Sequence, residues 1–234
     1  MKIIKYFLIA FAIIVIDQAF KLWVYFDHLN WPICGPNCYE IMVLGDWFRL
    51  HYLLNPGMAF GLKFDSEFGK LALTIFRIGA MFGIGYYLWR MAKQGAHAGL
   101  LISLGLILGG AVGNVIDSTF YGVFLDNAPS DAPMPWFHGQ VIDMLYFPLF
   151  DFVWPDWVPF FGGRYFEFFS PVFNIADSSI FVGVVIILVM QRKFLKENVE
   201  TSNIEHSSGE PVVTETQVTN PTNSTDQQNI TNSL

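Results

Sequence analysis

Residues 98–116 read AGLLISLGLILGGAVGNVI and contain no charged side chain. A helix of about 20 mainly apolar residues is long enough to cross the roughly 30 Å hydrocarbon core of a bilayer, so this run predicts a membrane-spanning helix. Similar apolar runs extend from about residue 6 to 26, from 68 to 89 and from 171 to 190. The sequence therefore predicts an all-α membrane protein with four transmembrane helices.

The composition of the 234-residue chain agrees with this fold class, since 53% of the residues are apolar, 17% are aromatic and only 14% are charged. Soluble domains carry about 25% charged residues, so this chain has few side chains to cover a surface that faces water. A net charge of −7 without a basic patch argues against a nucleic-acid partner. Cys34 and Cys38 are too few for a disulfide framework or for a zinc site of their own, and form either one local bridge or two free thiols.

The basic residues indicate the orientation of the helices, because Lys and Arg are enriched in cytoplasmic loops. They occur before the first run, between the second and third runs, and after the fourth run: Lys2, Lys5, Arg90, Lys93, Arg192, Lys193 and Lys196. Both termini are therefore expected in the cytoplasm, with residues 27–67 and 117–170 outside. A cleaved signal peptide is an alternative for the first run, but this run ends in Asp17-Gln18 without a small-residue cleavage site.

The two outer segments are rich in Trp, Phe, Tyr, Pro and Gly. Aromatic side chains favour the membrane interface, so both segments are expected to lie on the outer leaflet, with a short strand near Trp47–Leu54. From about residue 197 to 234 the chain turns to Thr, Asn, Ser, Gln and Glu without aromatics. This composition predicts a disordered cytoplasmic tail after a transmembrane domain of residues 1–196.

Ionisable side chains inside the predicted spans are costly to bury and mark functional or structural sites. Asp17 and Lys21 lie four residues apart on one face of the first helix and are expected to form an ion pair that orients it. Arg77 in the second helix needs a carboxylate or a group of carbonyl oxygens, and the sequence does not identify this partner.

Acidic and amide side chains gather at the outer ends of the third and fourth helices. Asn114 and Asp117 are three residues apart and share a helical face, and Asn174 and Asp177 repeat this spacing. Asp143 lies between the two motifs, inside the apolar stretch Val-Ile-Asp-Met. The pattern predicts two Asn-x-x-Asp faces at similar depth on the outer side of the membrane, with a third acid nearby.

Two carboxyl groups that lie close together cannot both ionise easily. They therefore share one proton, as in aspartic proteases. One carboxylate then activates water while the other carboxyl protonates the amide. Spacing alone leaves two other interpretations open, because Asn174 or Asp177 would also cap a helix start and intramembrane acids also serve ion or proton pathways. A transporter is expected to spread its acids through the membrane depth and to show internal repeats, whereas these acids gather at one side.

The polar motifs resemble, in content and order, those of lipoprotein signal peptidases (signal peptidase II). They are Asp17-Gln18-x-x-Lys21, Asn55-Pro56-Gly57-Met58-Ala59-Phe60-Gly61, Gly109-Gly110-x-x-Gly113-Asn114-x-x-Asp117, Val141-Ile142-Asp143 and Phe173-Asn174-x-Ala176-Asp177. Each motif alone is weak. Five motifs in this order on four spans, over about residues 1–195, make the resemblance specific.

The resemblance implies an aspartic endopeptidase of the bacterial inner membrane, without metal or cofactor, with its active site toward the periplasm. Such enzymes remove signal peptides from prolipoproteins by cutting before a diacylglyceryl-modified cysteine. It further implies a small extracytoplasmic β-cradle, contact with membrane lipid, a monomer, and binding of the family's cyclic-peptide inhibitor. Carried over by motif, Asp143 and Asp177 are the expected catalytic pair, Asn114, Asp117, Asn174, Asp17 and Lys21 support it, and Asn55, Gly57, Ala59 and Gly61 face the substrate.

Two positions depart from the family's pattern. Ser118 stands where members usually have Arg, so a bracing guanidinium is missing or comes from elsewhere, with Arg164 as a candidate. Members place the catalytic acid a few residues after the third-helix motif, which leaves Asp126 and Asp143 as alternatives. Asp143 is preferred, because its apolar flanks are kept and residues 127–135 have the composition of an inserted loop. Which acid of the pair holds the proton is not assigned from the sequence.

Overall fold

The computed structural model describes residues 3–35, 38–45, 47–57, 67–148, 150–168 and 171–207. The chain divides into two compact units, Met1–Asn198 and Val199–Leu234. All residues that build the site described below belong to the first unit.

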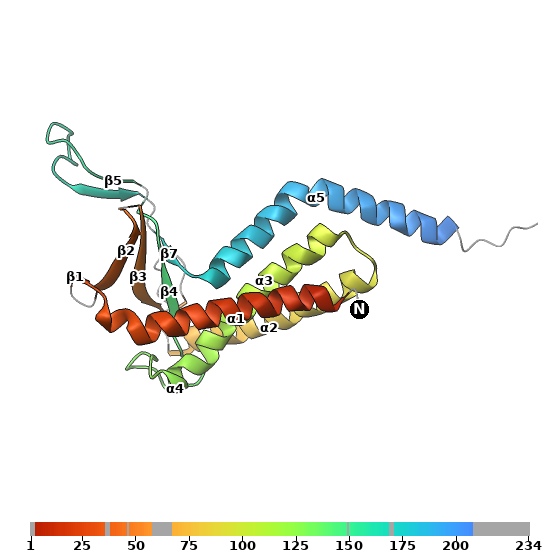
Figure 1. The fold of residues 1–234 in the computed structure, drawn as a ribbon, viewed down its shortest axis with the longest axis horizontal. Coiled ribbons are helices and arrows are strands. Elements are labelled where there is room, and N and C mark those ends of the chain that lie inside the picture. The colour runs from red at the N-terminus through yellow and green to blue at the C-terminus, as the bar shows by residue number, and fades with distance from the viewer. Residues whose placement is uncertain are drawn as a thin grey trace, which may run out of the picture. The chain divides into compact units, whose positions relative to one another are not determined.

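Four helices in the described part of the chain are long and apolar enough to cross a membrane, as predicted. They are α1 (Ile4–Asp27), α2 (Glu67–Lys93), α3 (Ala98–Ile116) and α5 (Ile175–Ser207) (Figure 1). The apolar part of the third span is 61% buried inside the protein, against 22% or less for the other three. α3 is therefore the central helix, and most of its side chains contact protein and not lipid.

Glycines in α3 let α1 and α5 approach its backbone closely. A Cβ at Gly109 would lie 2.8 Å from the carbonyl oxygen of Ala10 in α1, and a Cβ at Gly110 would collide with the carbonyl oxygen of Ala176 in α5. Gly113, one turn further on, also lies against Ala176. These contacts hold the first turn of α5 beside α3, because small residues let membrane helices approach each other closely.

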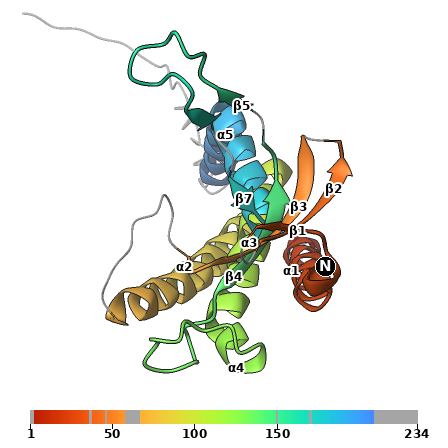
Figure 2. The ribbon, with the colours of Figure 1, turned by 90° about the vertical axis from the view of Figure 1, so that its left-hand side faces the viewer.

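Five antiparallel strands form a sheet in the order β1-β2-β3-β4-β7. Their bounds are β1 Ile33–Gly35, β2 Cys38–Leu44, β3 Phe48–Asn55, β4 Val141–Tyr146 and β7 Val172–Phe173. β3 confirms the strand that is predicted near Trp47–Leu54. A separate hairpin pairs β5 (Phe150–Val153) with β6 (Tyr165–Phe168). The five-stranded sheet lies at the end of the helix bundle where α1 ends (Figures 1 and 2).

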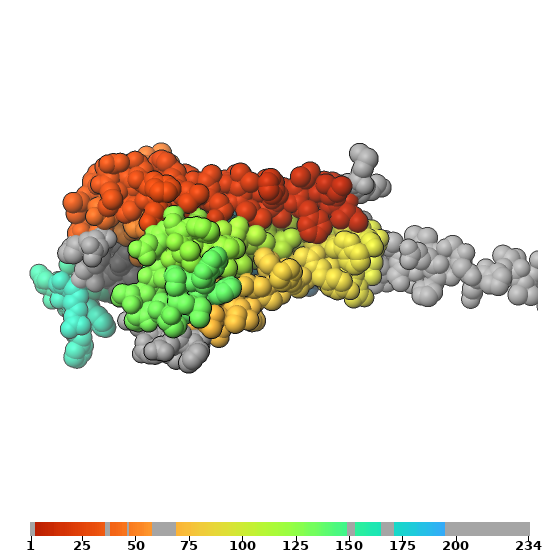
Figure 3. Space-filling view, turned by 90° about the horizontal axis from the view of Figure 1, so that it is seen from below, coloured from red at the N-terminus to blue at the C-terminus, as the bar shows by residue number. Residues whose placement is uncertain are grey.

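Within the residues that the structure describes, three short helices connect these elements. The 3-10 helix η1 (His28–Asn30) follows α1, and the π-helix η3 (Asp117–Tyr121) continues α3 into α4 (Gly122–Phe124). Tyr25 of α1 donates its hydroxyl hydrogen to the carbonyl oxygen of Leu125, just after α4, at 2.5 Å. Figure 3 shows this region (green) beside α1 (red) on one face of the molecule.

Both ends of the fourth helix lie at other residues than predicted. A helix from residue 171 is predicted, but Val172–Phe173 form β7 and α5 begins at Ile175, because Asn174 caps it with its side chain. At the other end α5 continues to Ser207, past residue 197, where the disordered tail is predicted to begin. Residues 175–210 contain no proline that would end the helix earlier. Residues 208–234 lie outside the described residues, and a disordered tail there stays a prediction.

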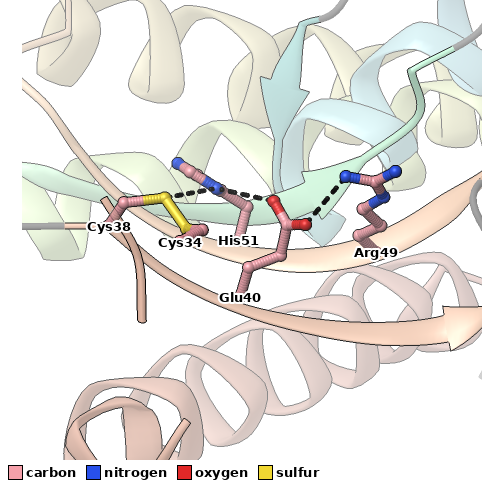
Figure 4. Close-up of a disulfide and its surroundings, with 5 residues drawn as sticks. All are labelled: Cys34, Cys38, Glu40, Arg49 and His51. Atoms are coloured by element: carbon pink, nitrogen blue, oxygen red, sulfur yellow. Dashed lines mark hydrogen bonds and ion pairs between the residues drawn. A yellow bond between two sulfur atoms is a disulfide. The ribbon is translucent and has the colours of Figure 1, made fainter. Parts of the chain in front are cut away.

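A disulfide joins Cys34 of β1 to Cys38 of β2, which decides between the two alternatives for these cysteines in favour of a bridge (Figure 4). Glu40, on the same strand as Cys38, accepts a hydrogen bond from Arg49 Nη1 at 2.9 Å and lies 3.3 Å from His51 Nδ1. The bridge ties the edge strand β1 to β2, and the polar contacts tie β2 to β3.

Candidate active site

Asp143 is the centre of a buried polar cluster at the junction of sheet and helices. It lies on β4 and is 1% exposed. Its Oδ2 accepts a hydrogen bond from Asn55 Nδ2 at 2.9 Å, and its Oδ1 accepts one from Asn174 Nδ2 at 2.7 Å. Asn55 ends β3, which pairs with β4 with Leu53 opposite Asp143. Antiparallel pairing thus brings together two residues that are 88 positions apart.

Burial, and after it repulsion from the Asp177 carboxylate, raise the pKa of the Asp143 carboxyl to about 7. The hydrogen bonds from Asn55 and Asn174 favour the charged form and oppose this rise. Asp143 is therefore a carboxyl group that exchanges its proton near neutral pH, and Asp177 is close enough to affect it.

Asp177 lies in the first turn of α5, where one asparagine holds it in relation to Asp143. Asn174 accepts a hydrogen bond from the backbone N–H of Asp177 at 2.9 Å, and Asn114 Nδ2 donates to Asp177 Oδ1 at 2.7 Å. Asn174 Nδ2 also lies 3.4 Å from Asn114 Oδ1. The structure thus brings together the two asparagines and two of the three acids that the motif spacing singled out.

Asp117, the third of these acids, belongs to a buried ion network next to Asp143 and Asp177. Lys21 Nζ lies 2.8 Å from Asp17 Oδ2 and 2.7 Å from Asp117 Oδ2, and all three side chains are fully buried. The predicted Asp17–Lys21 pair is therefore confirmed, with Asp117 as an additional partner. Lys21 also donates to Asn114 Oδ1 at 3.1 Å, and Asp17 Oδ1 accepts the backbone N–H of Ala176 at 2.9 Å. The network connects α1 and α3 to the first turn of α5.

Gln18 is a member of this network to which the sequence assigned no role. Its Nε2 donates to Asp117 Oδ1 at 2.8 Å, and its Oε1 accepts the hydroxyl hydrogen of Tyr121 at 2.9 Å. The signal that could have identified Gln18 is a polar amide next to Asp17 inside an apolar helix.

Arg77 of α2 has two neutral partners, which the sequence did not identify. Its Nη1 donates to Ser118 Oγ at 3.0 Å, and its Nη2 donates to the carbonyl oxygen of Gly57 at 3.2 Å. The Gly57 N–H in turn donates to Asn55 Oδ1 at 2.8 Å. Gly57 and Asn55 therefore lie at the site as expected, while Ala59 and Gly61 fall outside the described residues.

A family model described as Signal peptidase (SPase) II matches residues 9–192 of the chain. The chain belongs to the signal peptidase II family. The lipoprotein signal peptidase of Amoebophilus asiaticus is 48% identical to it over 85% of this chain and 82% of the relative. That of Porphyromonas gingivalis is 42% identical over 76% of this chain and 78% of the relative. As a signal peptidase, the protein is a protease, and its four apolar helices make it a multi-pass membrane protein.

Solved structures share the fold of this signal peptidase II chain. A bacterial membrane enzyme solved by the in meso method at 2.3 Å resolution has a TM-score of 0.51, covers 81% of this chain and 88% of its own, and is 22% identical. A second such structure, at 1.9 Å, has a TM-score of 0.50, covers 80% and 92%, and is also 22% identical. At this identity the likeness concerns the fold alone.

Ser118 is the position at which this signal peptidase II chain departs from the family's usual Arg. The structure places the guanidinium of Arg77 against the Ser118 hydroxyl. Arg164, the candidate substitute in the sequence, is exposed in the turn of the β5–β6 hairpin. The expectation that Arg164 supplies the bracing guanidinium is therefore wrong, because Arg77 reaches Ser118 from the neighbouring helix α2.

Asp126 and the segment after it lie apart from the acid pair. Asp126 is exposed, has a left-handed backbone with φ 51°, and lines a cavity of about 360 Å³ with Tyr25 and Tyr52. The following loop is fixed to the π-helix, since the Phe137 N–H donates to the carbonyl oxygen of Thr119 at 3.2 Å. In space, the acid beside Asp177 is therefore Asp143.

Proposed function

We propose that this signal peptidase II chain hydrolyses the peptide bond before a diacylglyceryl-modified cysteine of prolipoproteins, with Asp143 and Asp177 as its catalytic acid pair. The observation that carries the proposal is the raised pKa of a buried carboxyl on β4 that is held in electrostatic contact with a second carboxyl on α5. A pair with one shared proton is suited to amide hydrolysis at neutral pH.

In the proposed reaction Asp143 holds the shared proton in the resting site, and Asp177 is ionised. Asp177 takes a proton from water as the water oxygen attacks the scissile carbonyl carbon, and Asp143 gives its proton to the carbonyl oxygen. When the carbon–nitrogen bond breaks, the proton held by Asp177 passes to the leaving nitrogen, and a hydroxyl group of the tetrahedral intermediate returns a proton to Asp143, which restores the pair. Asn114 and Asn174 keep both carboxyl groups oriented through these proton transfers.

The proposed substrate reaches the pair from the outer side of the inner membrane, with both termini of the enzyme in the cytoplasm. The diacylglyceryl chains of the substrate would lie between the helices in the bilayer, so that binding energy from the lipid positions the scissile bond. We expect a monomer that uses no cofactor and that binds the cyclic-peptide inhibitor of the family.

The test is a gel-shift cleavage assay in liposomes with a diacylglyceryl-modified prolipoprotein. Wild type is compared with Asp143→Asn and Asp177→Asn, and the exposed acid Asp126→Asn serves as the matched control. We expect wild type and the control to cut and the other two variants to show no cleavage while remaining folded by thermal unfolding.

Each other outcome has a distinct meaning. Cleavage by Asp143→Asn together with loss of cleavage by Asp126→Asn would transfer the catalytic role to the exposed acid. A folded wild-type protein that leaves the lipidated precursor intact would overturn the proposed activity and favour an ion pathway.

A further inference from the structure

The Arg77 guanidinium joins two segments that are far apart in the sequence. One of its nitrogens binds the carbonyl oxygen of Gly57, in the turn after β3, and another binds the Ser118 hydroxyl on the π-helix η3. A planar guanidinium fixes both acceptors at once, because its N–H groups point in set directions. Arg77 therefore clamps the end of β3 to the end of α3.

The turn after β3 is shaped to receive this guanidinium. Gly57 has φ 89°, a left-handed conformation that favours glycine. A Cβ at this position would lie 2.8 Å from Arg77 Nη1 and 3.1 Å from Nη2. Any side chain at residue 57 would thus displace the clamp.

The same turn holds the amide that binds the catalytic carboxyl. Asn55 accepts the Gly57 N–H with its side-chain oxygen and donates its side-chain nitrogen to Asp143 Oδ2. A continuous series of hydrogen bonds therefore runs from Arg77 through Gly57 and Asn55 to Asp143.

The charge of Arg77 also acts on the site. Its two hydrogen-bond partners given above are neutral, whereas the carboxyl groups of Asp177, Asp117 and Asp143 all interact with it electrostatically. The carboxyl groups of Asp17, Asp117, Asp143 and Asp177 lie near the cations Lys21 and Arg77, and the buried cation Lys70 interacts with Arg77 in turn. Removing Arg77 leaves the acid pair with less positive charge around it.

We infer that Arg77 is a positioning residue for proteolysis, which holds the Asn55 turn and thereby the orientation of Asp143. The inference rests on the proposed function. Arg77 does this from α2, where the sequence marks it as a costly buried cation but does not identify its partners.

The test measures kcat and KM for cleavage of the lipidated precursor by Arg77→Ala, Arg77→Lys and the double variant Arg77→Ala with Ser118→Arg. Arg164→Ala, which removes an exposed guanidinium, is the matched control. We expect Arg77→Ala to lower kcat roughly 100-fold with little change in KM, since a misplacement of about 1 Å at a reacting group has this effect. Arg77→Lys keeps the cation but reaches only one acceptor, so a smaller loss is expected.

The double variant separates positioning from general damage to the fold. Ser118 Oγ lies 3.0 Å from the native guanidinium, so an arginine at residue 118 begins beside the vacated position and should restore a large part of kcat. Normal kcat in Arg77→Lys, or an equal loss in Arg164→Ala, would refute the inference. The Lys variant decides the question even if Arg77→Ala does not fold. An inactive wild type would instead be a failure of the proposed function.

Discussion

The side-chain amide of Asn174 donates a hydrogen bond to Asp143 Oδ1 at 2.7 Å. The carbonyl oxygen of the same side chain accepts the backbone N–H of Asp177, three residues later, at 2.9 Å. One asparagine therefore begins α5 and connects the two acids. The amide side chain offers a donor and an acceptor at once, which an ionised carboxylate at this position would not.

We predict that Asn174→Asp separates these two roles. An aspartate still caps the helix, but it cannot donate to Asp143 and adds a like charge beside it. Cleavage should fall by at least about 100-fold because the orientation of Asp143 is lost. Asn174→Ala should lose activity and, in addition, about 1 kcal/mol of unfolding free energy through the missing cap. Cleavage rates and thermal unfolding in detergent test both, and an active Asn174→Asp enzyme would contradict the assignment.

The pH dependence of cleavage follows from the raised pKa of Asp143, about 7. The reaction needs the proton of the pair, which is present below this pKa and is lost as pH rises through it, so kcat/KM should fall on the alkaline side of about pH 7. Asn55→Ala removes a hydrogen bond that lowers this pKa, so the alkaline fall should move to higher pH. A pH–rate profile from pH 5 to 9 of wild type and variant measures the shift, and a fall that moves to lower pH would exclude this account.

Lys21→Met should destabilise the protein strongly. The substitution leaves Asp17 and Asp117 buried without their shared cation. Loss of one partner from a buried ion pair typically costs about 3–5 kcal/mol. Thermal unfolding in detergent at pH 7 tests this, and Lys93→Met, in the last turn of α2, is the control that should unfold like wild type.

Gly110→Ala should weaken the packing of α5 on α3. The added methyl group would meet the Ala176 carbonyl oxygen and Ser179 Oγ, and overpacking of this kind costs roughly 1–3 kcal/mol. Gly83→Ala in α2, where a Cβ has open space around it, is the matched control and should keep or slightly raise stability. Equal unfolding temperatures for the two variants would show that the close approach of α5 does not matter.

Much of the fold could be predicted from the sequence, because a bilayer requires long apolar helices and penalises buried charge. The four apolar runs correspond to α1, α2, α3 and α5. The three-residue spacing of Asn114 and Asp117, and of Asn174 and Asp177, placed polar faces on two helices that the structure brings together. The assignment of the catalytic roles stays a prediction.

The remaining features depend on contacts between distant segments. Arg77 binds Gly57 and Ser118, which lie 20 and 41 residues away, and no periodicity encodes such partners. The π-helix η3 is stabilised by a later loop, whose Phe137 N–H binds the Thr119 carbonyl oxygen. Strand β4 was missed because its buried hydrophobic run is short and its partner β3 is far away in the chain.

The acid pair is divided between the buried strand β4 and the membrane helix α5, and this has a consequence for the biogenesis of the enzyme. A chain is synthesised from its N-terminus, so Asp143 emerges before Asp177 and Asn174. Asp17 binds the first turn of α5 through the Ala176 N–H, so Asp177 reaches its place only when both the first and the last span are in the membrane. We therefore expect that a nascent or partly inserted chain has no proteolytic activity, and that this activity appears only when the last span is in place.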